Sequence, residues 1–295
     1  MSDIDVKPSL LTRVRTLQAS SPKRNKEKTN DRQLMPPHLP EIGELYRTMP
    51  NHIARSSLFA PIGTKPKQIY SDVTLVSRQD AVIKFSGEQL DESQADVWMQ
   101  VMFEASKFPL GHPVEINRSK FLQAIGRTTT GTNYEWLHKS MEKLVLAILS
   151  IQFKCNRSQR ILTIGKNSEL HLINSFDYDD KSQKHILRID PRWSLMYRNN
   201  EYSLIDWSKR LKIGHKQDMA KSLQRLISTS SDEIQYYSLE WLKEKFVYTG
   251  RLRDFKPAVV KAMKELTRLK IITEARIEKS KKGNIQTVWR RLKNS

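Results

Sequence analysis

Two stretches of the chain repeat the same order of apolar and polar positions. In the first, Asn117 precedes a short amphipathic segment that ends at Gly126, and a polar turn leads to a longer segment with apolar positions at Leu137, Met141, Leu144, Val145 and Ile148. Asparagine is a favoured N-cap, and apolar residues every three or four positions line one face of a helix. Two β-like runs follow, Ile151 to Phe153 and Arg160 to Ile164. The pattern predicts helix, turn, helix and β-hairpin.

The same order returns near the C-terminus. Ser238 is a second N-cap candidate, and the helix that it begins is expected to end before Gly250. A second helix is predicted to start around Pro257, because proline is tolerated in the first turn of a helix. Its apolar face holds Val259, Ala262, Met263, Leu266 and Leu269. The runs Ile272 to Ile277 and Ile285 to Arg290, joined by a polar tip, predict another hairpin.

The two copies have matched spacing. From the cap to the first β run there are 34 residues in each copy (117 to 151 and 238 to 272). A further helix is predicted before each copy, over Glu92 to Lys107 and about Lys216 to Ser228. Three helices followed by a β-hairpin are typical of a winged helix. The sequence therefore predicts an α+β fold with two tandem winged-helix domains.

The predicted domains are 46–199 and 200–295, preceded by a flexible tail over 1–45. The tail is polar and basic and contains Pro22, Pro36, Pro37 and Pro40. It is either a solvated segment or one that makes loose phosphate or partner contacts. The strand-like segments Leu170 to Asp177 and His185 to Asp190 are expected to extend the sheet of the first domain.

The charge balance favours a polyanionic partner. Lysine and arginine total 51 against 32 aspartate and glutamate residues, a formal net charge of +19. Nucleic acid is the commonest such partner, because each neutralised phosphate releases a counterion. A membrane surface is the competing interpretation, but the chain has no basic amphipathic helix typical of that role. It also lacks an apolar run of the roughly 20 residues needed to span a bilayer.

Catalytic and metal-binding motifs are not found. Cys155 is the only cysteine, so neither an intramolecular disulfide nor a cysteine zinc cluster is expected. The seven histidines are scattered, unlike the paired histidines beside a nucleophilic tyrosine in a DNA-nicking enzyme, and no phosphate-binding G-x-x-x-x-G-K-[ST] loop occurs. Asp179 and Asp180 could ligate a metal, but a polar loop is the simpler interpretation. We expect a cytoplasmic protein without cofactor or enzymatic activity.

Candidate DNA contacts follow from the predicted second helix of each domain, which enters the major groove in helix-turn-helix proteins. In the C-terminal domain they lie at the helix entry, on the polar face and at the hairpin tip, namely Arg251, Arg253, Lys256, Lys261, Lys264, Arg268, Lys279, Lys281 and Lys282. In the N-terminal domain they lie in the turn and the helix after it, namely Arg127, Thr128, Thr129, Thr132, Asn133, Tyr134, His138 and Lys139. The alternatives are a solvated basic face and ordinary turn-forming residues.

One segment carries a family resemblance. Residues 46–59 read Tyr-Arg-Thr-Met-Pro-Asn-His-Ile-Ala-Arg-Ser-Ser-Leu-Phe. This string closely resembles the start of the common region of the TrfA-type replication initiators of IncP-like plasmids. The similarity continues through Val97 to Val101 and the helix at Asn133 and Tyr134, and it extends with lower similarity to the C-terminus.

The resemblance implies a tandem winged-helix initiator that binds repeated origin sites (iterons) in double-stranded DNA as a monomer. Such initiators open an adjacent AT-rich region and help to load the host replicative helicase, often together with the host initiator protein. Their homodimers bind iterons poorly and are associated with plasmid copy control. A transcriptional repressor that binds a single operator is the alternative function.

The resemblance also implies a possible contact with the replicative sliding clamp. Family members can carry a Gln-Leu-x-Leu-Phe-like segment upstream of the common region. The matching stretch here, Gln33-Leu34-Met35-Pro36-Pro37, keeps the glutamine and the first leucine but loses the terminal aromatic residue. A proline-broken linker is the alternative interpretation of this stretch.

Overall fold

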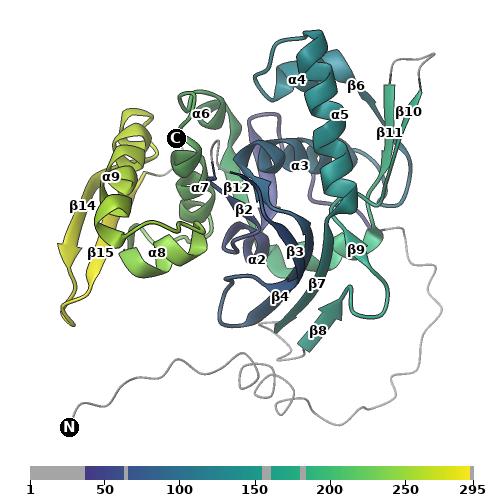
Figure 1. Cartoon of the computed structure of the whole chain (residues 1–295). Helices are drawn as coiled ribbons and strands as arrows, with labels where there is room; N and C mark the ends of the chain where they lie inside the picture. The colour runs from purple at the N-terminus through teal and green to yellow at the C-terminus, as the bar shows by residue number, and fades with distance from the viewer. Residues whose placement is uncertain (1–36, 63–65, 155–160, 180–183, 293–295) are drawn as a thin grey trace.

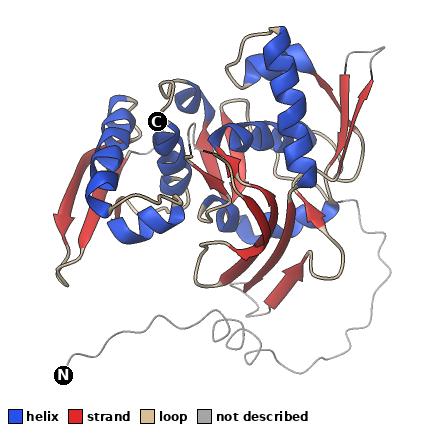
Figure 2. Ribbon diagram, viewed as in Figure 1, coloured by secondary structure: helices blue, strands red, loops and turns tan. Residues whose placement is uncertain are grey.

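The structure, a computed structural model, describes residues 37–62, 66–154, 161–179 and 184–292, which form both helices and strands (Figure 1, Figure 2). Two sets of elements lie side by side, one on the right of Figure 1 and the other, formed by the C-terminal residues, on the left. We call them the first and the second unit. The mixed helix and strand content agrees with the predicted α+β class.

The first unit contains a strand, two helices and a hairpin in chain order. They are β6 (Val114–Asn117), α4 (Arg118–Ala124), α5 (Gly131–Leu146), β10 (Ser175–Asp179) and β11 (Lys184–Arg188). Strand β11 pairs antiparallel with both β10 and β6, so the sheet order is β10-β11-β6. Helix α3 (Glu92–Ala105) precedes this set.

The second unit has the same connectivity. Its elements are β13 (Ile234–Ser238), α8 (Leu239–Lys245), α9 (Leu252–Arg268), β14 (Ile272–Lys279) and β15 (Ile285–Arg291), preceded by α7 (Asp218–Ile227). Strand β15 pairs antiparallel with both β13 and β14. In both units the strand before the two helices therefore joins the last strand of the hairpin that follows them.

The predicted hairpin of the first unit was assigned to the wrong segment. The runs at 151–164 do form a hairpin, β7 (Ile148–Lys154) and β8 (Ile161–Ile164), but it belongs to a separate five-stranded sheet with β3 (Ile69–Thr74), β4 (Ala81–Glu88) and β9 (Leu170–His171). The counterpart of β14 and β15 is β10 and β11, which begins 58 residues after Asn117 (117 to 175). The equal spacing of 34 residues was therefore coincidental.

Strand pairing explains why the chain makes this insertion. Strand β7 alternates buried and half-buried residues, and its buried side faces the same way as that of β4, with Ile83 opposite Ile151 and Phe85 opposite Leu149. All four side chains are at most 1% exposed. Pairing with β4 buries an apolar face that a lone hairpin would leave in water.

The remaining elements bring the start and the end of the first unit together. They are β1 (Tyr46–Pro50), α2 (Asn51–Ala54), β2 (Phe59–Ala60), β5 (Leu90–Asp91), the 3-10 helix η1 (Pro191–Asn200), β12 (Tyr202–Asp206) and α6 (Trp207–Leu211). Strand β1 pairs antiparallel with β12, and β2 pairs in parallel with β5. The segment that carries the family resemblance thus lies against the chain that leads into the second unit.

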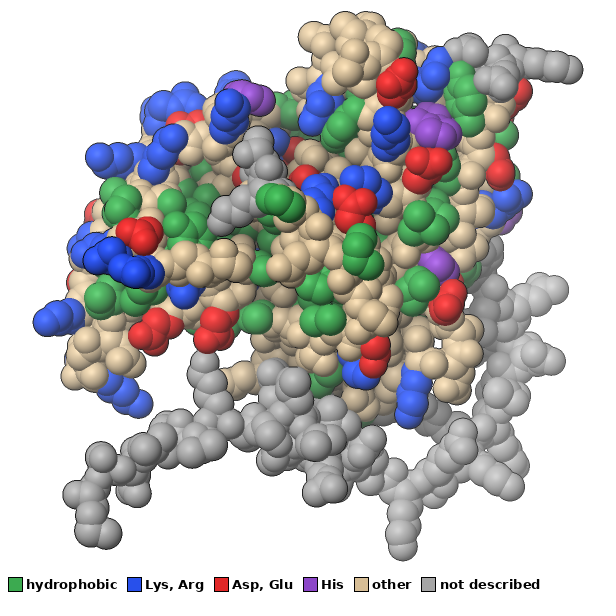
Figure 3. Space-filling view, viewed as in Figure 1, with side chains coloured by type: hydrophobic (Ala, Val, Ile, Leu, Met, Phe, Trp, Pro, Cys, Tyr) green, Lys and Arg blue, Asp and Glu red, His purple; other side chains and the backbone are tan. Residues whose placement is uncertain are grey.

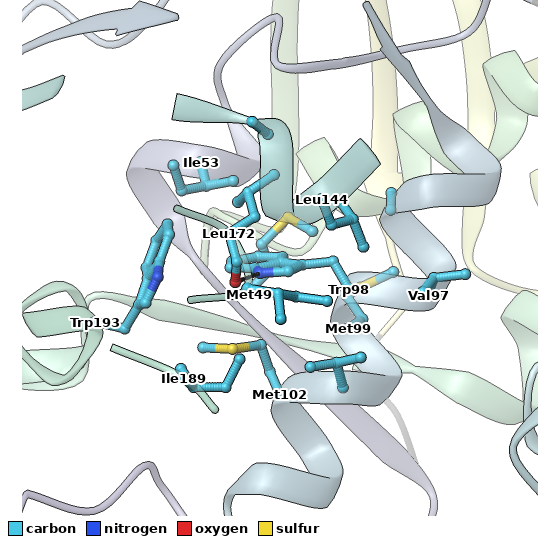
Figure 4. Close-up of a cluster of buried hydrophobic side chains, with 14 of the residues drawn as sticks. Met49, Ile53, Val97, Trp98, Met99, Met102, Leu144, Leu172, Ile189 and Trp193 are labelled. Carbon is cyan, nitrogen blue, oxygen red and sulfur yellow. Dashed lines mark hydrogen bonds between the residues drawn. The ribbon is translucent and has the colours of Figure 1, made fainter. Parts of the chain in front are cut away.

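Helix α3 forms the centre of the first unit. Asp91 begins it with a capping box, since its side chain accepts hydrogen bonds from the backbone of Ser93 and Gln94. Residues on all sides of α3 are buried, which is typical of a helix inside a core. Trp98 is fully buried, donates from Nε1 to the carbonyl of Leu172 at 3.1 Å, and packs edge-on against Trp193 (Figure 4).

The second unit has its own hydrophobic core. It forms where α7, α8 and α9 pack on the three-stranded sheet, around Leu226, Leu242, Phe255, Leu266 and Trp289. The first core continues beyond the predicted domain boundary at 199/200, through Ile205 and Trp207, and the second core begins at Ile213.

A buried network of charges joins the two units. Glu92 of α3 accepts hydrogen bonds from Arg210 at 2.8 Å and from Arg225, and all three side chains are fully buried. Asp96, one turn along α3, pairs with Arg210 and with Lys221 of α7, both at 2.5 Å. Burial alone would raise the pKa of Glu92, but the two guanidinium groups outweigh it and lower the pKa to about 2.

Two further contacts cross the same junction. Lys245 of α8 is fully buried and donates to the carbonyl of Ser56 at 3.0 Å, and Arg225 donates to the carbonyl of Phe59 at 2.9 Å. Burial lowers the pKa of Lys245 well below its ordinary value. Side chains of the second unit thus satisfy backbone carbonyls of the resembling segment, which makes the two units one packed body.

We expect Glu92→Gln to destabilise the protein strongly. The substitution keeps the size of the side chain but leaves two buried guanidinium groups without their carboxylate, and breaking a buried pair costs about 3–5 kcal/mol. Urea unfolding at neutral pH measures the change. The matched control is Glu104→Gln, whose partly exposed pair with Lys107 should be worth less than about 1 kcal/mol. Equal losses for both variants would show that the network does not hold the units together.

Candidate nucleic-acid interface

Helix α9 presents a basic face to solvent. Its buried side carries Phe255, Val259, Ala262, Met263 and Leu266, which places Lys256, Lys261 and Lys264 on the exposed side. None of these three lysines forms an ion pair with the described part of the chain. Their charge is therefore available to an external anion.

The entry to α9 is exposed as well. The helix begins at Leu252, so the predicted start at Pro257 was five residues too late. Phe255 belongs to the buried side of the helix. Burial of this side chain favours a helical turn ahead of Pro257, although the proline removes one backbone donor. Arg251 and Arg253 lie at this start, and the Arg253 side chain is 74% exposed beside Asp254, 3.7 Å away. Both arginines are therefore accessible to an external ligand.

Arg268, at the far end of α9, has a different environment from the lysines. It pairs with Glu265 at 2.7 Å and donates to the carbonyl of Lys212 at 3.0 Å. The hydrogen bond from Arg268 lowers the pKa of Glu265 to about 2. Arg268 thus ties the end of the helix to the chain between α6 and α7.

The tip of the β14–β15 hairpin is a second basic feature. Lys279, Lys281 and Lys282 are exposed, and Gly283 takes the left-handed conformation (φ 83°) that closes the turn. On the strands, Arg276 pairs with Glu278 and Arg290 pairs with two glutamates, whereas Arg291 donates to the carbonyl of Ser230. No carboxylate among the described residues pairs with the three lysines, so the tip carries most of the unpaired positive charge of the hairpin.

In the first unit the turn between α4 and α5 is held by its own side chains. The guanidinium of Arg127 lies 3.4 Å above the ring of Trp136 and donates to Asn133 at 3.3 Å. Asn133 in turn donates to the backbone carbonyl of Thr128 at 2.9 Å. Arg127 and Asn133 therefore order the turn, while Thr128, Thr129 and Thr132 are exposed.

The structure adds residues to the first unit that the sequence did not suggest. Arg118, at the start of α4, lies 4.7 Å from both the Tyr134 ring and the Tyr178 ring of β10. The Tyr134 hydroxyl is 2.7 Å from that of Ser119. These contacts hold the β10–β11 hairpin beside the start of α5. Arg118 and Tyr178 were not predicted as site residues, because the hairpin of this unit was predicted at residues 151–164.

His138 lies between this hairpin and solvent, with its side chain 44% exposed and 3.4 Å from Glu142. It contacts the rings of Phe176, Tyr178 and His185. His185 is buried, and burial, followed by the nearby His138 and Arg118, lowers its pKa to about 4. The ring is half-buried within an aromatic cluster. The role of His138 as a DNA contact stays a prediction.

The exposed faces of α5 and α9 differ in charge. On α5, Lys139 lies between Glu135 and Glu142, and all three are exposed. On α9 the corresponding face is lysine-rich. In Figure 3, Lys and Arg side chains gather along the edge of the second unit, on the left. The second unit is therefore the stronger attractor of a polyanion.

Other predicted features are not part of this surface. The clamp-binding candidates Gln33 and Leu34, and also Cys155 and Asp180, lie outside the described residues. Among the residues that are described, no cluster of His, Cys, Asp and Glu could hold a metal ion. No helix within the described ranges is long and apolar enough to cross a membrane.

Comparison with known proteins gives matches in sequence and in structure. A family model described as TrfA protein matches residues 10–278. The plasmid replication initiator protein TrfA from Escherichia coli is 24% identical over 199 residues, which is 66% of this chain and 51% of that protein. The chain thus spans about half the length of this curated relative.

Two crystal structures of domains 2 and 3 of RctB are similar in fold. They superpose with TM-scores of 0.53 and 0.52 at 11% and 10% identity. The superpositions cover 82% and 81% of this chain and 96% of each RctB chain. A similar fold over about four fifths of this chain therefore occurs in a protein of very different sequence.

We expect Lys261→Gln/Lys264→Gln to reduce the salt dependence of DNA binding. Each phosphate contact contributes about 0.9 to the slope of log K against log salt, so the double variant should lower the slope by about two. Fluorescence anisotropy across a salt series measures it. Lys84→Gln/Lys166→Gln, which removes two charges from the five-stranded sheet and its edge, is the control. An unchanged slope in the α9 variant would place this face outside the interface.

Arg253→Ala tests whether the entry to α9 reads a base. An arginine that bonds a guanine edge contributes about 1–3 kcal/mol of discrimination, so the variant should lose preference at one base position. A DNA site is first selected with the wild-type protein. Binding to duplexes that carry single-base substitutions of that site measures the preference. Equal weakening on specific and random DNA would instead make Arg253 a phosphate contact.

Proposed function

The chain belongs to the TrfA family, and from that membership we propose that it is a plasmid replication initiator that binds repeated sites in origin DNA. The observation that carries the proposal is the repeated connectivity of two units in a strongly basic chain, locked together by the charges around Glu92. Two linked units can read one long site, and a row of such sites can assemble several copies.

We propose that each unit is a winged helix. In each, a strand and two helices precede a hairpin, and the first strand pairs with the last strand of that hairpin. In this arrangement the second helix, α5 or α9, enters the major groove and the hairpin lies beside it. The exposed starts of α5 and α9 agree with that role.

The two units would make different contributions to DNA recognition. The lysines of α9 and of the β14–β15 tip would supply most of the phosphate contacts, because the described carboxylates leave them unpaired. The threonines at the start of α5 would read base edges and phosphates at short range, with few charges nearby. Affinity would therefore depend mainly on the second unit, and the first unit would contribute mainly to specificity.

Initiation in this proposal needs binding and no catalysis. The binding energy of several copies on adjacent repeats would offset the energy needed to deform the neighbouring AT-rich DNA, whose flexible base steps deform easily. The host helicase and host initiator protein would then be recruited to the open strands. A homodimer would limit copy number by competing with the monomer that binds repeats, and the protein would act in the bacterial cytoplasm.

A permanganate footprint on a supercoiled plasmid that carries the cognate origin tests this proposal. We expect unpaired, reactive thymines in the AT-rich region once the repeats are occupied. A repressor that binds a single operator would leave the duplex closed. Full occupancy of the repeats without reactive thymines would overturn the initiator function, and a covalent protein–DNA adduct would point to a nicking enzyme.

A further inference from the structure

A third basic surface lies between the two units, where the sequence predicted no contact. The chain between α6 and α7 exposes Lys212 and Lys216, and the turn after α9 exposes Lys270. None of these lysines forms an ion pair with a described residue. Three unpaired cations are thus placed at the junction.

The segment between α6 and α7 is held against the end of α9. Arg268 donates to the carbonyl of Lys212 at 3.0 Å, and the backbone N–H of Gly214 donates to Glu265 at 2.8 Å. Lys209 of α6 donates to the carbonyl of Lys270 at 3.2 Å. These bonds fix the junction lysines relative to the basic face of α9.

The end of α6, just before this segment, lies close to the turn before α5. A side chain at Gly126, in the turn before α5, would meet Leu211 at 3.2 Å. A cleft of about 660 Å³ opens here, with Gly126 and Arg127 on one side and residues 211–216 on the other. The junction lysines therefore lie between the turn that precedes α5 and the end of α9.

The cleft itself is lined by both signs of charge, with Arg127, Lys216 and Lys221 as its positive residues. Asp91 and Asp96 also line it but are paired with Lys67 and Lys221, whereas no described cation pairs with Asp218 within 4.0 Å. A phosphate would therefore be attracted to Lys216 and the other junction lysines and repelled by Asp218. A polyanion that crosses the junction would therefore run over the surface and would not enter the cleft.

We propose that Lys212, Lys216 and Lys270 contact the phosphate backbone of the DNA between the segments that α5 and α9 read. This inference rests on the proposed DNA-binding function. The three lysines would add affinity without base preference, because phosphate contacts carry no direct sequence information. They would also hold the intervening DNA against the junction, so that both units engage one continuous duplex.

The test is the triple variant Lys212→Gln/Lys216→Gln/Lys270→Gln in the full chain. Its salt slope on a duplex selected by the wild-type protein should fall by between two and three, since each phosphate contact contributes about 0.9. Its preference among single-base substitutions of that duplex should be unchanged. The control is Lys84→Gln/Lys107→Gln/Lys166→Gln, which removes the same net charge away from the junction and should change the slope by less than one.

The outcomes separate this inference from the proposed function. A wild-type protein that selects no duplex contradicts the proposed function itself. If the wild-type protein binds but the junction triple variant behaves like its control, the junction contact is overturned while DNA binding stands. Loss of preference at particular base positions would also overturn it, because the lysines would then read bases. If the triple variant does not fold, Lys212→Gln alone should lower the slope by about one, and no change would count against the proposal.

Discussion

The carboxylate of Glu92, buried between Arg210 and Arg225, is the interaction on which the arrangement of this protein depends. It comes from the central helix of the first unit, Arg210 comes from α6, where the chain leaves that unit, and Arg225 comes from α7 of the second. A fully buried carboxylate and its guanidinium partners are stable only together, because each ion alone would lose its hydration without a compensating charge. The network therefore makes one orientation of the two units much more favourable than others.

The backbone contacts at the junction have the same consequence. The resembling segment at the start of the first unit has two carbonyls, those of Ser56 and Phe59, that receive hydrogen bonds from Lys245 and Arg225. Part of the resemblance to initiators thus lies where the two units meet. In a protein that reads one site with two units, the junction sets the distance between them.

The candidate site was partly accessible from the sequence. Lys256, Lys261 and Lys264 could be placed on an outer face because the apolar stripe of α9 has helical spacing, and the structure exposes all three. Arg268 of α9 and Asn133 of α5 were also predicted to contact DNA, and the structure shows that their side chains bond Glu265 and Thr128. Local patterns place a side chain on a face of a helix, but they do not show which polar group it will bond.

The order of elements was determined by the sequence itself, because caps, apolar periodicity and turn residues act over a few positions. The mixed helix and strand class and the two basic features of the second unit followed from those short-range signals. The partner of each strand, the insertion of β7 to β9 and the junction between the units were decided by tertiary structure. Glu92 and Arg225 are 133 residues apart, and any strand with an alternating pattern can pair with several others. Only the folded chain selects the pairing that buries the apolar faces of the strands and brings Glu92 to its two arginines.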